Sequence, residues 1–138
     1  MNRTRLRAQL QLHEGRRAFV YQDTVGKATI GVGRNLVDRG LSDDEINLLL
    51  DNDITAAYNE AVRIIPGFNT LSEDRQHALI DMIFNLGAAG LLKFKKFLAA
   101  IEARDFERAA TEMMDSKWAR QVGQRAETLK AMIWPKSA

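Results

Sequence analysis

Only one stretch of this sequence departs from helical spacing, and it lies near the start of the chain. Between residues 19 and 33, aromatic and β-branched side chains such as Phe19, Tyr21 and Ile30 are interrupted by glycines, a composition typical of short strands and tight turns. The apolar residues on either side of this stretch recur at the spacing of helices. The fold class is therefore predicted to be α+β and predominantly helical, with one small β region.

The β region is preceded by a helix and contains a turn. Leucines at helical spacing predict a helix over residues 1–14 that ends at Gly15. Asp23 and Gly26 occupy the first and fourth positions of a common type I turn. Residues 15–41 are therefore expected to form a small β-hairpin lobe.

Residues 42–66 are predicted to form a long helix that joins two lobes. Ser42 and Glu45 have the spacing of a capping box at its start. Pro66 and Gly67 end the helical spacing. At 1.5 Å per residue such a helix is roughly 35 Å long.

The rest of the chain, residues 67–138, is predicted to form a helical lobe. Ser72 caps its first helix, which is apolar nearly all round and is expected to be buried and to stop at Gly87. Further helices are expected over residues 91–103, 105–115 and 125–134, with a short one around Trp118. Since 138 residues contain no repeat and no long linker, the chain is predicted to be a single domain.

Several kinds of site are excluded or disfavoured by the residues present. The chain has no cysteine, which excludes a disulfide scaffold, a cysteine-ligated metal and a thiol nucleophile. His13 and His77 are not spaced as metal ligands, so no metal site and no cofactor are expected. No apolar run approaches the ~20 residues of a spanning helix, and neither a signal peptide nor a membrane insertion is predicted.

Charge is distributed unevenly along the chain. Residues 1–40 hold eight basic and three acidic side chains. Residues 41–81 hold two basic and nine acidic side chains, and residues 82–138 hold ten basic and six acidic ones. The cationic ends favour an anionic partner without identifying it. A nucleic-acid binder would present a basic helix with base-reading side chains, and none is visible.

Two carboxylates flank the one sharp corner of the chain. Glu14 ends a helix and is expected to be partly desolvated by Leu10 and Phe84, which favours its protonated form and suits a general acid. Asp23 lies in a polar turn, where it is expected to stay ionised. Cleavage of a glycosidic bond requires such a pair. A surface carboxylate and a turn former would account for the same two residues.

The segment from His13 to Gly33 resembles the signature of phage-type lysozymes. It contains the glutamate–glycine pair, the tyrosine-x-aspartate-threonine motif and the threonine-isoleucine-glycine-x-glycine motif in register. Residues 42–57, 82–87 and 116–125 resemble the inter-lobe helix, the buried helix and the late cleft segment of that family. The resemblance implies a lysozyme-like fold and hydrolysis of bacterial peptidoglycan with inversion at the anomeric carbon.

The resemblance also implies a role for each matching residue. Glu14 would donate the proton, Asp23 would stabilise the developing positive charge, and Thr29 would hold the attacking water. The expected substrate contacts are Arg34, Asn35, Asn85, Trp118, Gln121 and Arg125; helix capping and core packing are the alternative, above all for Trp118. The sequence departs from the T-even members in having arginine at 34, asparagine at 85 and a shorter lobe after Asn35.

The sequence therefore predicts a muramidase, acting as a phage or prophage endolysin, that cleaves the β-1,4 bond between N-acetylmuramic acid and N-acetylglucosamine. It is expected to be a monomer that stays in the host bacterial cytoplasm until release to the wall, with peptidoglycan as its partner. The alternative is a non-catalytic wall-binding or lysis-regulatory domain on the same fold. A nucleic-acid binder is the third and least favoured reading.

Overall fold

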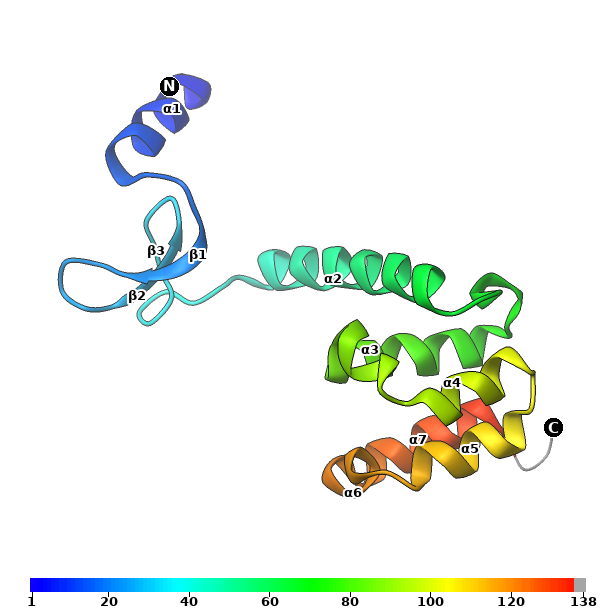
Figure 1. Ribbon diagram of the computed structural model, residues 1–138. Helices are drawn as coiled ribbons and strands as arrows, with labels where there is room; N and C mark the ends of the chain where they lie inside the picture. Colours follow the sequence, from blue (N-terminus) through cyan, green and yellow to red (C-terminus); the bar gives the residue numbers. More distant parts are fainter. Residues whose placement is uncertain (136–138) are drawn as a thin grey trace. The chain divides into compact units, whose positions relative to one another are not determined.

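The computed structural model describes residues 1–135 and divides into two compact units, Met1–Leu49 and a second one from Leu50 onward (Figure 1). Over these residues it contains seven α-helices and one three-stranded antiparallel sheet. The predicted α+β, predominantly helical fold class is confirmed. The boundary between the units falls inside helix α2, Asp43–Ile64, and the single-domain assignment stays a prediction.

The first unit contains one helix and the whole sheet. Its elements are α1 Arg3–Glu14, β1 Arg17–Gln22, β2 Ala28–Gly31 and β3 Arg34–Asn35, and the strands lie in the order β1-β2-β3. The predicted turn is confirmed, because the Gly26 N–H donates to the Asp23 carbonyl at 3.0 Å. Strand β3 is an addition, since a two-residue strand leaves no periodic signal in a sequence.

Helix α2 begins at the predicted capping box. The Glu45 N–H donates to the Ser42 hydroxyl at 3.2 Å, and the Ser42 N–H donates to Glu45 Oε1 at 2.9 Å. These bonds satisfy two groups that every helix N-terminus leaves unpaired. The helix ends at Ile64, two residues before Pro66, as its sequence predicts.

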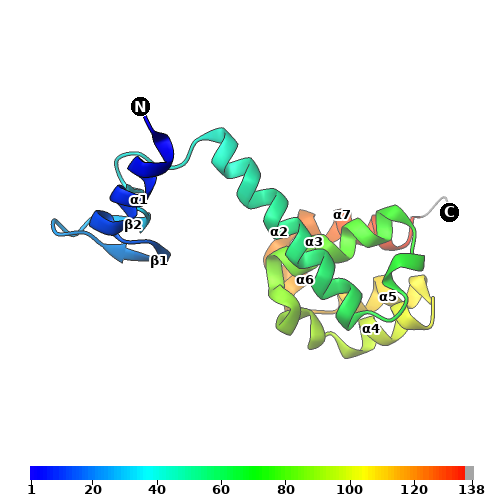
Figure 2. The same cartoon turned by 90° about the horizontal axis from the view of Figure 1, so that it is seen from above.

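The second unit is a helical bundle. Its elements are the 3-10 helix η1 Phe68–Thr70 and the helices α3 Glu73–Leu92, α4 Lys95–Glu102, α5 Phe106–Met114, α6 Lys117–Val122 and α7 Gln124–Ile133 (Figure 2). Helix α5 packs against α4, α6 and α7, and α7 packs against α3. The bundle buries a continuous apolar core that includes Leu79, Met82, Phe97, Met113 and Leu129.

Helix α3 differs from its prediction in two respects. The chain does break its helical geometry at Gly87, where φ is 72° and ψ is 163°, but helical turns resume and run on to Leu92. The next helix therefore starts at Lys95 instead of residue 91. Phe84 is 43% exposed, so α3 is not buried all round.

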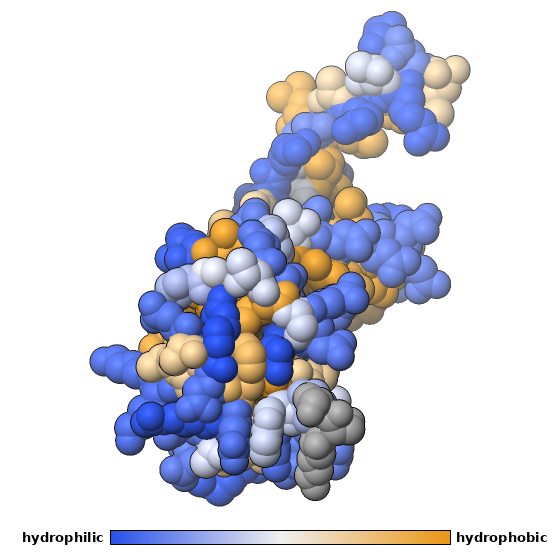
Figure 3. All heavy atoms as spheres, turned by 90° about the vertical axis from the view of Figure 1, so that its right-hand side faces the viewer, coloured by the Kyte–Doolittle hydropathy of each residue, from blue (hydrophilic) through white to orange (hydrophobic). Residues whose placement is uncertain are grey.

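Burial distinguishes the two units. Every buried apolar side chain of residues 1–135 lies in the second unit, whereas the first unit buries only Thr29. Phe19 on β1 is 85% exposed. On the face shown in Figure 3, hydrophobic residues are interspersed with hydrophilic ones. Within the first unit, main-chain hydrogen bonds, more than apolar burial, therefore hold the small sheet in shape.

Among residues 1–135, none of the helices taken singly has the length and apolar character needed to cross a membrane.

Candidate active site

Glu14 is positioned by the end of its helix and by a glycine on the neighbouring loop. Gly15 follows it with φ at 80°, and its N–H closes α1 on the Gln11 carbonyl at 3.0 Å. Gly33 has φ at 75°, and a Cβ built there would lie 3.1 Å from Glu14 Oε2. A side chain at position 33 would therefore push the Glu14 carboxylate by a few tenths of an ångström, at a backbone conformation that favours glycine. Within the first unit Glu14 is exposed, and its expected desolvation by Phe84 of the second unit stays a prediction.

Asp23 is fixed by main-chain donors. Its Oδ1 accepts the N–H groups of Val25 and Lys27, each at 2.9 Å. Its own N–H donates to the Lys27 carbonyl at 3.0 Å. Asp23 Oδ2 has no hydrogen bond among the described residues. One carboxylate oxygen is thus held in place while the other is available to a ligand.

Thr29 is the buried polar residue of the first unit, with 3% of its surface exposed. Its hydroxyl donates to the Lys27 carbonyl at 2.8 Å. In the sheet it pairs with Tyr21 on β1 and Asn35 on β3. Because the hydroxyl proton is engaged, the oxygen is left to accept a hydrogen bond, as from a water molecule.

These three groups line one cavity of the first unit. Its volume is about 450 Å³, and its other lining residues are Arg17, Tyr21, Gln22, Thr24, Gly33 and Asn35. The volume lies in the range of small-ligand sites. The cavity brings together two carboxylates, the pair that hydrolysis of a glycosidic bond uses, and the hydroxyl of Thr29.

Five residues that line this cavity were not predicted as site residues, namely Arg17, Tyr21, Gln22, Thr24 and Gly33. Tyr21 faces Thr29 across the β1–β2 pair. The guanidinium carbon of Arg17 lies 4.2 Å from the centroid of the Tyr21 ring, a cation–π geometry. Once the hairpin turn is placed, the strand register alone brings Tyr21 opposite Thr29.

Asn35 lies at the cavity with its amide already engaged. Its Oδ1 accepts the N–H groups of Val37 and Asp38, and its Nδ2 donates to Asp38 Oδ2 at 3.0 Å. The amide therefore organises the loop after β3, and its expected contact with substrate stays a prediction.

Arg34 does not line the cavity that contains Glu14. Its guanidinium donates to Glu45 Oε1 at 2.7 Å and to the Gly40 carbonyl at 3.2 Å, and it borders a separate hollow with Arg39 and Leu41. It ties the sheet to the start of α2. This pairing provides a structural role for the arginine.

The Arg34–Glu45 pair predicts a pH-dependent contribution to stability. The hydrogen bond from Arg34, followed by those from Ser42, lowers the pKa of Glu45 from 4.5 to about 2. A carboxyl whose pKa is lowered by folding stabilises the fold above its unfolded pKa, and that contribution is lost as the pH falls through the folded value. Glu45→Gln should therefore lower the thermal unfolding midpoint of the first unit above pH 4.5. The difference from the unmodified protein should shrink as the pH falls towards 2. The NMR amide signal of Thr29, recorded during heating at each pH, measures this midpoint. An equal difference at every pH would contradict this account.

In the second unit, Trp118 and Asn85 contact each other. The indole N–H of Trp118 donates to Asn85 Oδ1 at 2.6 Å. Trp118 is 5% exposed and packs edge-to-face on Phe94 with the ring centroids 6.0 Å apart. Core packing, the alternative to substrate contact considered for Trp118, accounts for these contacts. Gln121 is exposed.

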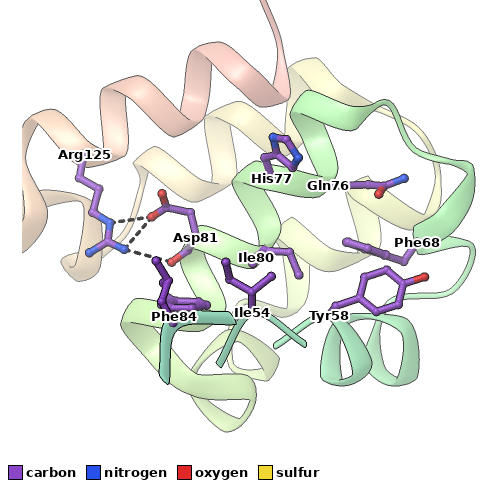
Figure 4. A pocket seen from close by; sticks show the side chains of 10 residues that line it. Ile54, Tyr58, Phe68, Gln76, His77, Ile80, Asp81, Phe84 and Arg125 are labelled. Atoms are coloured by element: carbon purple, nitrogen blue, oxygen red, sulfur yellow. Dashed lines mark hydrogen bonds and ion pairs between the residues drawn. The ribbon is translucent and has the colours of Figure 1, made fainter. Parts of the chain in front are cut away.

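Arg125 borders a mainly apolar cavity of about 460 Å³ in the second unit (Figure 4). The other lining residues are Leu50, Ile54, Tyr58, Phe68, Gln76, His77, Ile80, Asp81 and Phe84. Figure 4 shows Arg125 paired with Asp81, whose Oδ1 accepts from Nε at 2.7 Å. Within residues 1–135, no cluster of three or more histidine, aspartate or glutamate side chains could hold a metal ion.

Comparison with known proteins gives a consistent result. The sequence model of a family described as phage lysozyme matches residues 11–132. Two proteins of Dictyostelium discoideum, named probable T4-type lysozyme 2 and probable T4-type lysozyme 1, are each 27% identical to the chain. Their alignments span 150 and 154 positions and cover 88% and 90%, respectively, of both sequences.

The chain is also 27% identical, over 152 positions, to the pre-baseplate central spike protein Gp5 of Enterobacteria phage T4. That alignment covers 90% of this chain but 26% of Gp5. The similarity therefore concerns nearly the whole of the Dictyostelium proteins and one part of the spike protein.

Proposed function

Because the chain belongs to the phage lysozyme family, we propose that it hydrolyses the β-1,4 bond between N-acetylmuramic acid and N-acetylglucosamine in bacterial peptidoglycan. The observation that carries this proposal is the cavity lined by Glu14, Asp23 and Thr29. Two relatives named as lysozymes, which align over most of their length, support the same activity.

The proposed reaction is a single displacement with inversion. Glu14 gives its proton to the glycosidic oxygen as the bond from that oxygen to the anomeric carbon breaks. A water held by Thr29 forms the new bond on the opposite face of the sugar, and its proton passes to the free Oδ2 of Asp23. The Asp23 carboxylate also stabilises the positive charge that develops on the sugar.

The proposed setting is lysis of a bacterial host by a phage or prophage enzyme that works as a monomer. The basic side chains of residues 1–40 and 82–138 would attract the protein to the anionic wall. Attraction of this kind weakens with added salt.

The products formed from purified murein test this proposal. We expect soluble fragments that end in reducing N-acetylmuramic acid, with the α-anomer predominating when the products are first detected by NMR. Fragments ending in N-acetylglucosamine would contradict the assigned bond. Sedimentation of the protein with murein in the absence of products would instead favour the non-catalytic wall-binding alternative.

Gly33→Ala tests whether the backbone beside Glu14 matters for activity. The new Cβ would lie 3.1 Å from Glu14 Oε2 at a residue with φ of 75°, so the carboxylate must move. We expect murein hydrolysis to fall about tenfold or more, since small displacements of a catalytic group are costly. Gly40→Ala is the matched control, because Gly40 has φ of 61° and open space around its Cβ position. Equal losses of activity in both variants would show that strain alone is responsible.

A further inference from the structure

The main chain of Lys27 connects the two groups proposed to handle the attacking water. Its N–H donates to Asp23 Oδ1 at 2.9 Å, and its carbonyl accepts from the Thr29 hydroxyl at 2.8 Å and from the Asp23 N–H at 3.0 Å. Movement of these main-chain groups would shift the atoms to which both Asp23 and Thr29 are anchored. The position of Lys27 therefore sets the geometry of both.

The side chain of Lys27 is anchored elsewhere in the same unit. Its ammonium donates to Asp38 Oδ2 at 2.5 Å, and the same carboxylate oxygen accepts from Asn35 Nδ2 at 3.0 Å. Asn35 is the β3 partner of Thr29 in the sheet. The contacts thus form a closed ring from Thr29 through Lys27, Asp38 and Asn35 back to Thr29.

The charges in this ring reinforce one another. The hydrogen bond to Asp38, and then the negative charge of Asp38, raise the pKa of Lys27, and the more distant charge of Asp23 acts in the same direction. The Lys27 hydrogen bond in turn lowers the pKa of Asp38. Both groups are therefore ionised around neutral pH, where a wall hydrolase would work.

The ring does little for the stability of the fold as a whole. The Lys27 and Asp38 side chains are 41% and 54% exposed, and ion pairs between exposed side chains contribute little to folding. The ring instead restrains local structure, namely the turn that carries Asp23 and the strand that carries Thr29. Resting on the function proposed above, we propose that Lys27 and Asp38 are positioning residues, whose ion pair holds Asp23 and Thr29 at the separation that water attack requires.

Two variants remove one partner each while keeping the size of the side chain, Lys27→Met and Asp38→Asn. We expect each to lower kcat for murein hydrolysis about tenfold with KM unchanged, because the loss affects orientation in the transition state. The double variant should have a kcat no lower than that of either single variant, since each single substitution already removes the same interaction. Lys27→Arg should recover most of the activity, and Lys96→Met, on an exposed lysine of α4, should behave as the unmodified protein.

A second measurement does not depend on activity. Hydrogen exchange of the Val25 and Lys27 amides, both bonded to Asp23 Oδ1, reports directly on the turn. We expect their protection to fall several-fold in Lys27→Met and Asp38→Asn and to recover in Lys27→Arg. Unchanged protection together with unchanged kcat would overturn the positioning role. If the unmodified protein does not digest murein, the proposed function fails, and amide protection still decides whether the ion pair orders the turn.

Discussion

Glu14→Gln is expected to lower the rate of murein digestion by at least about a hundredfold, in line with the contribution of a positioned general acid. Glutamine has the shape of glutamate and can occupy the same place beside Gly33, but it has no carboxyl proton to give to the glycosidic oxygen. Release of soluble muropeptides from purified murein measures the effect.

Glu102→Gln is the matched control for this experiment, because Glu102 is an exposed carboxylate at the end of α4. It should digest murein at the original rate. The glutamine variant at position 14 should still sediment with murein, which separates loss of chemistry from loss of binding. Digestion at an undiminished rate by Glu14→Gln would remove the proton donor from the proposed mechanism.

Phe97→Ala is expected to cause the largest loss of stability. Phe97 is 1% exposed in the core of the second unit and packs edge-to-face on Phe94 with the ring centroids 6.3 Å apart. Truncating a buried phenylalanine removes apolar burial and leaves a cavity, which together cost about 3–5 kcal/mol. Urea unfolding followed by tryptophan fluorescence measures this, since Trp118 also packs edge-to-face on Phe94.

Phe19→Ala makes the same chemical change at a side chain that is 85% exposed. It should change the urea midpoint of the second unit by little, because surface substitutions are usually close to neutral. A similar shift in both variants would mean that fluorescence does not report on packing around Phe97.

Local signals predicted the course of the chain well. The capping box at Ser42, the cap at Ser72 and the stop at Gly15 each depend on residues within a few positions of one another. Such contacts are encoded locally and can be found without knowing the fold. The three catalytic candidates came mainly from the resemblance of the segment from His13 to Gly33 to the phage-type lysozyme signature, and Glu14, Asp23 and Thr29 lie within sixteen residues of sequence.

Contacts between distant residues were not predictable. Nothing in the sequence pairs Trp118 with Asn85, Arg125 with Asp81, or Arg34 with Glu45. The resemblance assigned Trp118, Asn85, Arg125 and Arg34 to the substrate, and each of these four side chains has a partner within its own unit that only packing reveals. The helical turns after Gly87 were misjudged for a related reason, because a glycine can kink a helix without ending it.

The bonds made by residue 27 to Asp23 and Thr29 come from its main-chain N–H and carbonyl, which every amino acid except proline can supply in full. A different side chain at this position therefore keeps these main-chain hydrogen bonds but, unless it is cationic, loses the ion pair with Asp38 that is proposed to restrain the turn. Proline is the one substitution at this position that would delete a donor to the Asp23 carboxylate. A change of charge at residue 27 would thus loosen the proposed restraint on Asp23 and Thr29 while leaving the main-chain bonds of the turn available.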